Sequence, residues 1–165
     1  MALLSRYRTA TGAGTLAAAI LVLAFGNPAY VAWAQNDANT NPKDAGGWFL
    51  RLLAWPAWRF DSNESVREMF AADVKALLLI IFTTLFLYLL PGSQLARARG
   101  TLSQFFAGWA AYIFAGALAG LLSALIVSNP TLLAAFNAAG TGAIYGLFVG
   151  WIVGIAALGG WRGTD

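Results

Sequence analysis

The feature that most constrains this chain is a long stretch without charge, because no Asp, Glu, Lys or Arg occurs between Arg99 and Arg162. A soluble domain carries about 25% charged residues, so a run of this length cannot form the outside of a soluble fold. It is long enough for two membrane crossings, since each crossing needs about 20 apolar residues. The whole chain is 59% hydrophobic and only 10% charged. We therefore expect an integral membrane protein.

Apolar segments along the chain predict an all-α membrane fold with four transmembrane helices. The expected spans cover about residues 10–34, 72–91, 104–127 and 140–158, within a single domain, 1–165. Residues 35–71 form the loop between the first two spans. The sequence TLLAAFNAAG, just before the last span, is expected to be a short connecting helix or an extension of that span.

The first apolar segment allows two interpretations. Arg6 and Arg8 precede it, and Ala32 and Ala34 give its end the small-x-small pattern of a cleaved secretory signal. The same residues are also sufficient for a helix that stays in the protein. We expect the segment to be retained, with Pro28 kinking the helix near its outer end.

The distribution of cations predicts the orientation in the membrane. One side holds five arginines and a single acid, Asp165; the other holds five cations and six acids, all within residues 35–75. The positive-inside rule gives weight to Lys and Arg in short segments near the ends of spans. Both termini and the 92–103 loop are therefore expected in the cytoplasm, and the bias toward alanine and arginine suggests the plasma membrane of a bacterium. The five arginines on the cytoplasmic side are Arg6, Arg8, Arg97, Arg99 and Arg162.

The loop between the first two spans contains an aromatic segment, WFLRLLAWPAWRF, at residues 48–60. Tryptophan and arginine gather at the membrane–water boundary, where rings are partly buried and guanidinium groups reach headgroups. Pro56 interrupts any helix here, so we expect this segment to lie on the outer face of the bilayer. Asp61 and Glu64 then form a D-x-x-E pattern that predicts the start of a short helix leading into the second span. The expected interface residues are Trp48, Arg51, Trp55, Trp58 and Arg59.

Glycines recur every four residues in the fourth span, which gives three overlapping GxxxG motifs, the pattern of a glycine zipper. The third span has a related set of small residues. Residues four apart share one face of a helix, and a face without side chains lets another helix approach closely. Contact between the third and fourth spans is the expected use of these faces, with a subunit interface or a pore lining as alternatives. The expected packing residues are Gly142, Gly146, Gly150 and Gly154 in the fourth span, and Gly108, Gly116 and Gly120 in the third.

The chemistry available to this chain is limited. It has no cysteine and no histidine, which excludes disulfides, thiolate metal sites and histidine-ligated zinc or haem. The clustered carboxylates, Asp61, Glu64, Glu68 and Asp73, could bind a cation or transfer protons, but helix capping and surface solvation explain them more simply. Hydroxyls within the spans are expected to bond to their own helix backbone. We predict no catalytic residue, metal or cofactor.

Three functions are compatible with these features of the sequence. The favoured one is a non-catalytic accessory or structural subunit of a larger membrane complex or homo-oligomer. The second is a small homo-oligomeric channel or transporter, which would need a polar pore. The third is a membrane enzyme that acts on lipid at the outer surface through residues 48–75. The expected partners are membrane lipids and other membrane chains or further copies of this one, with no role for nucleic acid.

Overall fold

The computed structural model describes residues 10–40, 45–60, 65–92, 101–127 and 131–162. Within these ranges the chain is all-helical, with six helices and no strand. In chain order they are α2 (Ala10–Phe25), α3 (Pro28–Thr40), α4 (Ala45–Leu53), α5 (Val66–Gly92), α6 (Thr101–Ile126) and α7 (Leu132–Arg162).

Three of these helices, α5, α6 and α7, are long and apolar enough to cross a membrane. The first predicted span is different, because α2 and α3 are long and apolar enough to cross a membrane only when they are taken together. The two helices are bent by 65° at a short break. The sequence predicted a kink near Pro28 within one helix. The structure instead ends α2 at Phe25 and begins α3 at Pro28, so the pair forms one span only if a broken helix is counted.

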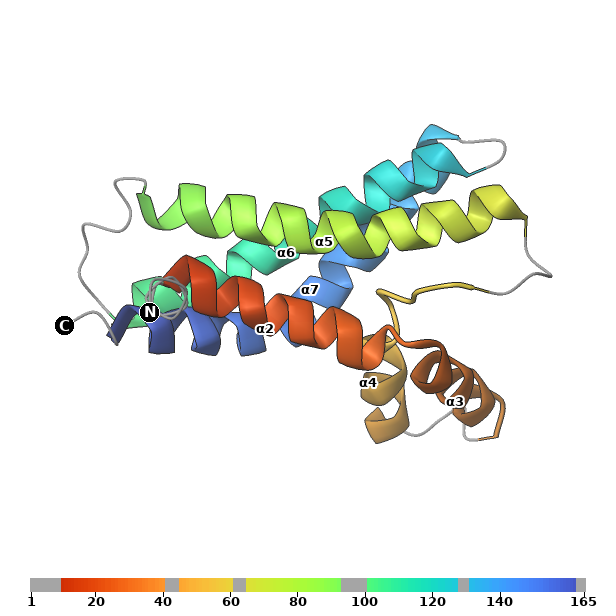
Figure 1. Ribbon diagram of the computed structural model, residues 1–165, viewed down its shortest axis with the longest axis horizontal. Coiled ribbons are helices and arrows are strands. Elements are labelled where there is room, and N and C mark those ends of the chain that lie inside the picture. Colours follow the sequence, from red (N-terminus) through yellow and green to blue (C-terminus); the bar gives the residue numbers. More distant parts are fainter. Residues whose placement is uncertain (1–9, 41–44, 61–64, 93–100, 128–130, 163–165) are drawn as a thin grey trace.

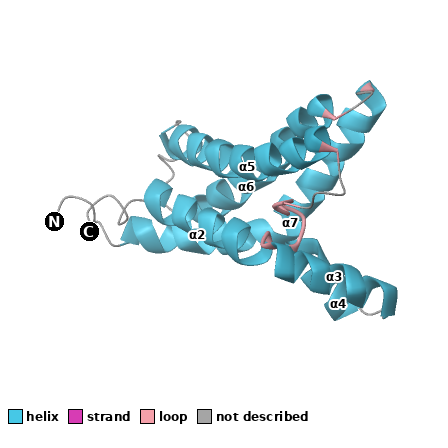
Figure 2. Ribbon diagram, turned by 45° about the vertical axis from the view of Figure 1, so that its right-hand side comes forward, coloured by secondary structure: helices cyan, strands magenta, loops and turns pink. Residues whose placement is uncertain are grey.

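The four apolar stretches form an antiparallel bundle (Figure 1). Helices α6 and α7 make the most extensive contact, α5 packs on α6, and α2 packs on both α5 and α7. The start of α2, the end of α5, the start of α6 and the end of α7 lie at the same end of the bundle (Figure 1). At the other end, α3 and α4 pack together and project sideways (Figure 2).

Small and branched side chains fill the core of this bundle. Helix α2 contributes Ala18, Leu21 and Val22, which are buried against the longer helices. In the other helices the buried positions recur at helical spacing, so each helix turns one stripe inward and leaves bulky side chains outside. Those buried positions include Ala76, Leu79 and Leu87 in α5, Ala111, Ala115 and Ala119 in α6, and Val149, Val153 and Ala157 in α7.

The break between α2 and α3 has a local cause. A Cβ atom at Gly26 would collide with the carbonyl oxygens of Val22 and Pro56, so only glycine fits between α2 and the segment after α4. The carbonyl of Gly26 accepts a hydrogen bond from the backbone N–H of Trp58, at 2.8 Å. The side chain of Asn27 then caps α3 by accepting from the N–H of Tyr30, at 2.9 Å, and Pro28 occupies the first helical position.

The helix starts also differ in detail from the sequence prediction. Ser65 caps α5 by accepting from the N–H of Glu68, whereas the predicted capping residues Asp61 and Glu64 lie outside the described residues. Thr131 caps α7 in the same way, through the N–H of Ala134. The segment that the sequence left as a connecting helix or an extension is therefore part of α7.

Candidate functional site

The predicted glycine faces of α6 and α7 lie against each other within one chain. A Cβ atom at Gly142 would collide with the backbone carbonyl of Gly116, and one at Gly116 would collide with that of Gly142. Gly120 lies equally close to the backbone of Ala138. Further along the pair, Gly146 meets the backbone at Ile113, Gly150 meets Trp109, and Gly154 meets Phe105 and Gly108. All seven glycines predicted for packing are buried in this contact or beside it.

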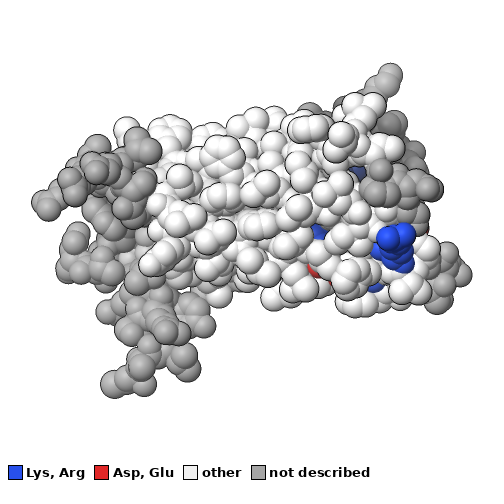
Figure 3. Space-filling view, turned by 90° about the horizontal axis from the view of Figure 1, so that it is seen from above, with Lys and Arg blue, Asp and Glu red and all other residues white. Residues whose placement is uncertain are grey.

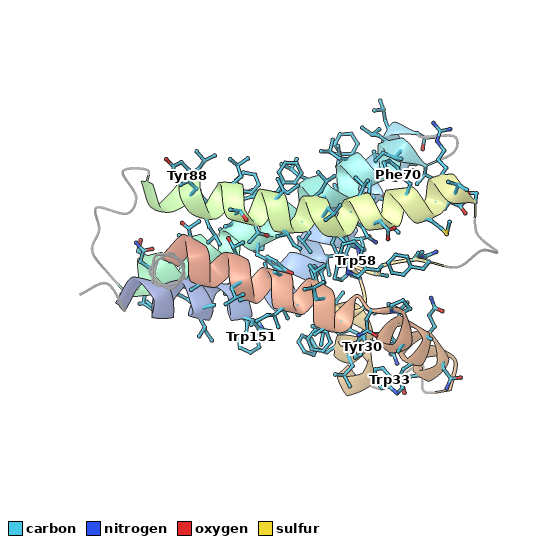
Figure 4. The ribbon with its side chains drawn as sticks, in the orientation of Figure 1. Tyr30, Trp33, Trp58, Phe70, Tyr88 and Trp151 are labelled. Atoms are coloured by element: carbon cyan, nitrogen blue, oxygen red, sulfur yellow. The ribbon has the colours of Figure 1, made fainter. Side chains whose placement is uncertain are left out.

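The fully or nearly buried hydroxyls of α5, α6 and α7 bond to one another or to their own helix. The hydroxyls of Thr83 and Ser123 donate to the carbonyls of Leu79 and Gly120, as expected for hydroxyls in membrane helices. Tyr112 and Tyr145, both fully buried, share a hydrogen bond of 3.0 Å between their hydroxyl oxygens. Tyr88, near the end of α5, points away from the bundle and is 73% exposed (Figure 4).

The aromatic segment at residues 48–60 reaches this tyrosine pair. Helix α4 ends at Leu53, and a tight turn then directs Trp55 inward, where its ring stacks on Tyr145 with 4.9 Å between the centroids. Trp48, near the start of α4, contacts Phe148 edge-on at 5.0 Å. The sequence predicted all three tryptophans of the segment at the bilayer surface. It could not reveal that Trp55 packs within the bundle, because its partner is distant in the chain.

The contact between Trp55 and Tyr145 lies near the middle of α7. A rise of about 1.5 Å per residue puts Tyr145 about 20 Å from the start of α7 at Leu132 and about 25 Å from its end at Arg162.

Trp58 lies between the end of α2 and α5 (Figure 4). Its indole N–H is buried and has no acceptor among the described residues, which is rare for a buried donor.

Three cations, Arg51, Arg59 and Lys75, line the space beside Trp55. Arg51 forms an ion pair with Asp37 at 2.8 Å, which ties α4 to α3. The backbone N–H of Arg59 donates to the carboxylate of Asp73, at 3.1 Å. The ammonium group of Lys75 lies over the ring of Trp55, 4.8 Å from its centroid, a distance suited to a cation–π contact. Among the described carboxylates, none lies within ion-pair distance of Lys75.

Two cavities meet at these cations. The first, of about 380 Å³, lies between α5, α6 and α7 and is lined by Trp55, Arg59 and Lys75, by Glu68, and by the small residues that face them. The second, of about 390 Å³, shares Trp55, Arg59 and Lys75 and extends toward α3 and Arg51. In the part of the surface drawn in colour, charge gathers at one end of the molecule and the middle is uncharged (Figure 3).

The cavities suit binding better than acid–base chemistry. Glu68 is the only carboxylate that lines the first cavity among the residues that the structure describes, and it faces two cations. The described residues include no group of three acidic side chains close enough to hold a metal ion. The sequence predicted Trp55, Arg59 and Lys75 at the membrane–water interface, but not that they line one cavity. The small residues Ala71 and Ala72 just before Lys75 were the only signal that this face of α5 borders a space.

No known protein family, curated protein or solved structure matches this chain.

Proposed function

We propose that this chain is a non-catalytic integral membrane protein that serves as an accessory or structural subunit of a larger membrane complex. In this proposal it crosses the plasma membrane of a bacterium four times, with the broken α2–α3 pair as the first span and both termini in the cytoplasm. The order of the helices is compatible with this, since four crossings return the chain to the end where α2 begins.

The observation that carries the proposal is that the small-residue faces and the buried hydroxyls of the described helices have partners within the chain. The small-residue faces of α6 and α7 are occupied by each other, and the hydroxyls of Thr83, Ser123, Tyr112 and Tyr145 bond within the chain. A conduit for ions needs polar groups that a solute can reach. A self-contained bundle supports a structural role more than a pore within the monomer.

The outer faces supply the surface that a partner or lipid would contact. Bulky apolar side chains are exposed on every long helix, and they match either acyl chains or the helices of another membrane chain. These residues include Leu16, Ile20 and Leu23 on α2, Leu77, Ile81 and Leu85 on α5, Phe106, Phe114 and Leu118 on α6, and Leu147, Trp151 and Ile155 on α7.

The experiment is purification in a mild detergent, followed by mass spectrometry of the intact assembly. We expect a second membrane protein in a stoichiometric ratio, and we expect it to persist when Gly159, which has open space around it, is replaced by alanine. A ring of identical chains, or a monomer at every detergent concentration tested, would contradict the proposed role.

A further inference from the structure

We propose that the cavity between α5, α6 and α7 binds the phosphate of an anionic lipid headgroup, and that Lys75 and Arg59 provide its positive charge. The proposal concerns a ligand site and goes beyond the structural role suggested above. It depends on three features of the described residues: two cations that line the same cavity, the small residues that make room beside them, and the position of the cavity on the bundle.

The first feature is the charge around the cavity. Lys75 and Arg59 both line it, and Glu68 is the only acid among its described lining residues, so these residues carry one net positive charge. Asp73 lies beside them, since its carboxylate accepts from the backbone N–H of Arg59. The contact between Lys75 and the ring of Trp55 holds the ammonium group in place without neutralising it. A cation removed from bulk water is stabilised by an anion that can hydrogen-bond to it.

The second feature is the space beside these cations. Five lining residues, from three helices, have either a single methyl group or a hydrogen as their side chain: Ala71 and Ala72 in α5, Gly120 and Ala124 in α6, and Ala138 in α7. The resulting volume of about 380 Å³ falls within the range of small-molecule sites. Two hydroxyls also line it, but Ser123 donates to Gly120 and Thr141 donates to Asn137. The anion would therefore be held by the cations.

The third feature is the location, which favours a lipid over a soluble anion. The first turns of α5 carry Arg67, Glu68, Asp73 and Lys75, whereas α6 and α7 carry no charge from their first residues to Trp161. The cavity lies where the charged turns of α5 meet the uncharged helices α6 and α7. Headgroups and acyl chains meet at such a boundary, and long cationic side chains there reach toward phosphate.

The test measures lipid binding to the full chain in a non-ionic detergent, by native mass spectrometry during titration with phosphatidylglycerol. We expect one phosphatidylglycerol to bind saturably and more tightly than phosphatidylcholine, in which choline neutralises the phosphate. Lys75→Met should weaken this binding roughly tenfold, because one charge-assisted hydrogen bond is lost. Lys75→Arg keeps the charge and should retain most of the affinity.

Arg67→Met is the matched control, since Arg67 lies on the same helix but does not line the cavity. It should change the affinity less than about twofold, the size expected for a screened surface charge. If Lys75→Met fails to fold, Arg59→Gln, on an exposed residue outside the helices, provides the second variant.

Three results would overturn the proposal: equal affinity for the two lipids, an affinity unchanged in both Lys75→Met and Arg59→Gln, or equal losses in Arg67→Met and Lys75→Met. A separate titration with inorganic phosphate identifies the source of the anion. Displacement of phosphatidylglycerol by low millimolar phosphate would contradict the lipid assignment. Because the assay needs no partner chain, a failure to find an assembled complex does not affect its outcome.

Discussion

The closest approach between helices in this bundle depends on single hydrogen atoms. At Gly116 and Gly142, the backbones of α6 and α7 lie so near that a methyl group on either residue would overlap a carbonyl of the other. Van der Waals contact of this kind is a main source of helix association in lipid, where the hydrophobic effect between helices is weak. In contrast, a Cβ atom at Gly140 or Gly159 of α7 would have no atom of another helix within 4 Å.

The neighbouring glycines of α7 give a sharp test of this contact. We expect Gly142→Ala to reduce the free energy of unfolding by about 1–3 kcal/mol, the size of an overpacking substitution. Gly140→Ala should be neutral or stabilising, because its Cβ points into open space and alanine favours the helix by up to about 1 kcal/mol. The measurement is reversible unfolding in mixed micelles. Equal stability of the two variants would show that α6 and α7 do not approach at Gly142.

The tyrosine pair predicts a second, non-additive effect. Tyr145→Phe leaves the hydroxyl of Tyr112 buried without a partner, which should cost about 1–3 kcal/mol of unfolding free energy. The double variant, with phenylalanine at both positions, removes both hydroxyls and should recover most of that loss. A double-mutant cycle on unfolding measures the coupling. Additive losses in the cycle would contradict the hydrogen bond, and the ring stacking of Trp55 on residue 145 is kept in every variant.

At the scale of elements, α2 behaves as part of the bundle. Besides its buried Ala18, Leu21 and Val22, it forms two polar contacts with α5. Thr11 donates to the carbonyl of Leu87, and Thr15 donates to the hydroxyl of Thr84, each at 3.2 Å. Removing α2 would expose the buried stripes of α5 and α7 to lipid and leave these groups to find other partners.

This packing predicts that the first segment is retained in the mature protein. Intact mass and N-terminal sequencing of protein purified from membranes should show a chain that includes α2. Replacing Ala18 by leucine should overpack the core and lower the melting temperature, whereas the same change at exposed Ala24 should not. A mature chain that begins at Gln35 would contradict the prediction.

In the proposed four-span arrangement, both termini and the 92–103 loop lie on the cytoplasmic side of the membrane. The loop between the first two spans, which contains α4, lies on the outer side. Cysteines placed singly at Ala45 and Gly100 should react from opposite sides of the membrane with a reagent that cannot cross it. The chain has no cysteine of its own, so each variant carries one reactive thiol. Labelling of both positions from outside would contradict the four-span arrangement.

The sequence was sufficient to predict the helical class and the three long apolar helices, because uninterrupted hydrophobic runs determine both. Glycine spacing also predicted which faces of α6 and α7 could pack closely, and the structure brings those faces together. It predicted a kink near Pro28, but not a 65° break that separates two helices, since the narrow space between Val22 and Pro56 at Gly26 exists only after folding. The cavity beside Lys75 depends likewise on three helices meeting, which no local pattern encodes.

The short length of α2 has a consequence for the surrounding bilayer. Its 16 residues extend about 24 Å, less than the roughly 30 Å of a hydrocarbon core, whereas the 31 residues of α7 extend about 46 Å. The protein therefore presents different hydrophobic lengths around its circumference. We expect the bilayer to thin beside α2, and we expect α7 to tilt. This uneven mismatch would favour lipids with shorter acyl chains on the flank of the molecule that α2 forms.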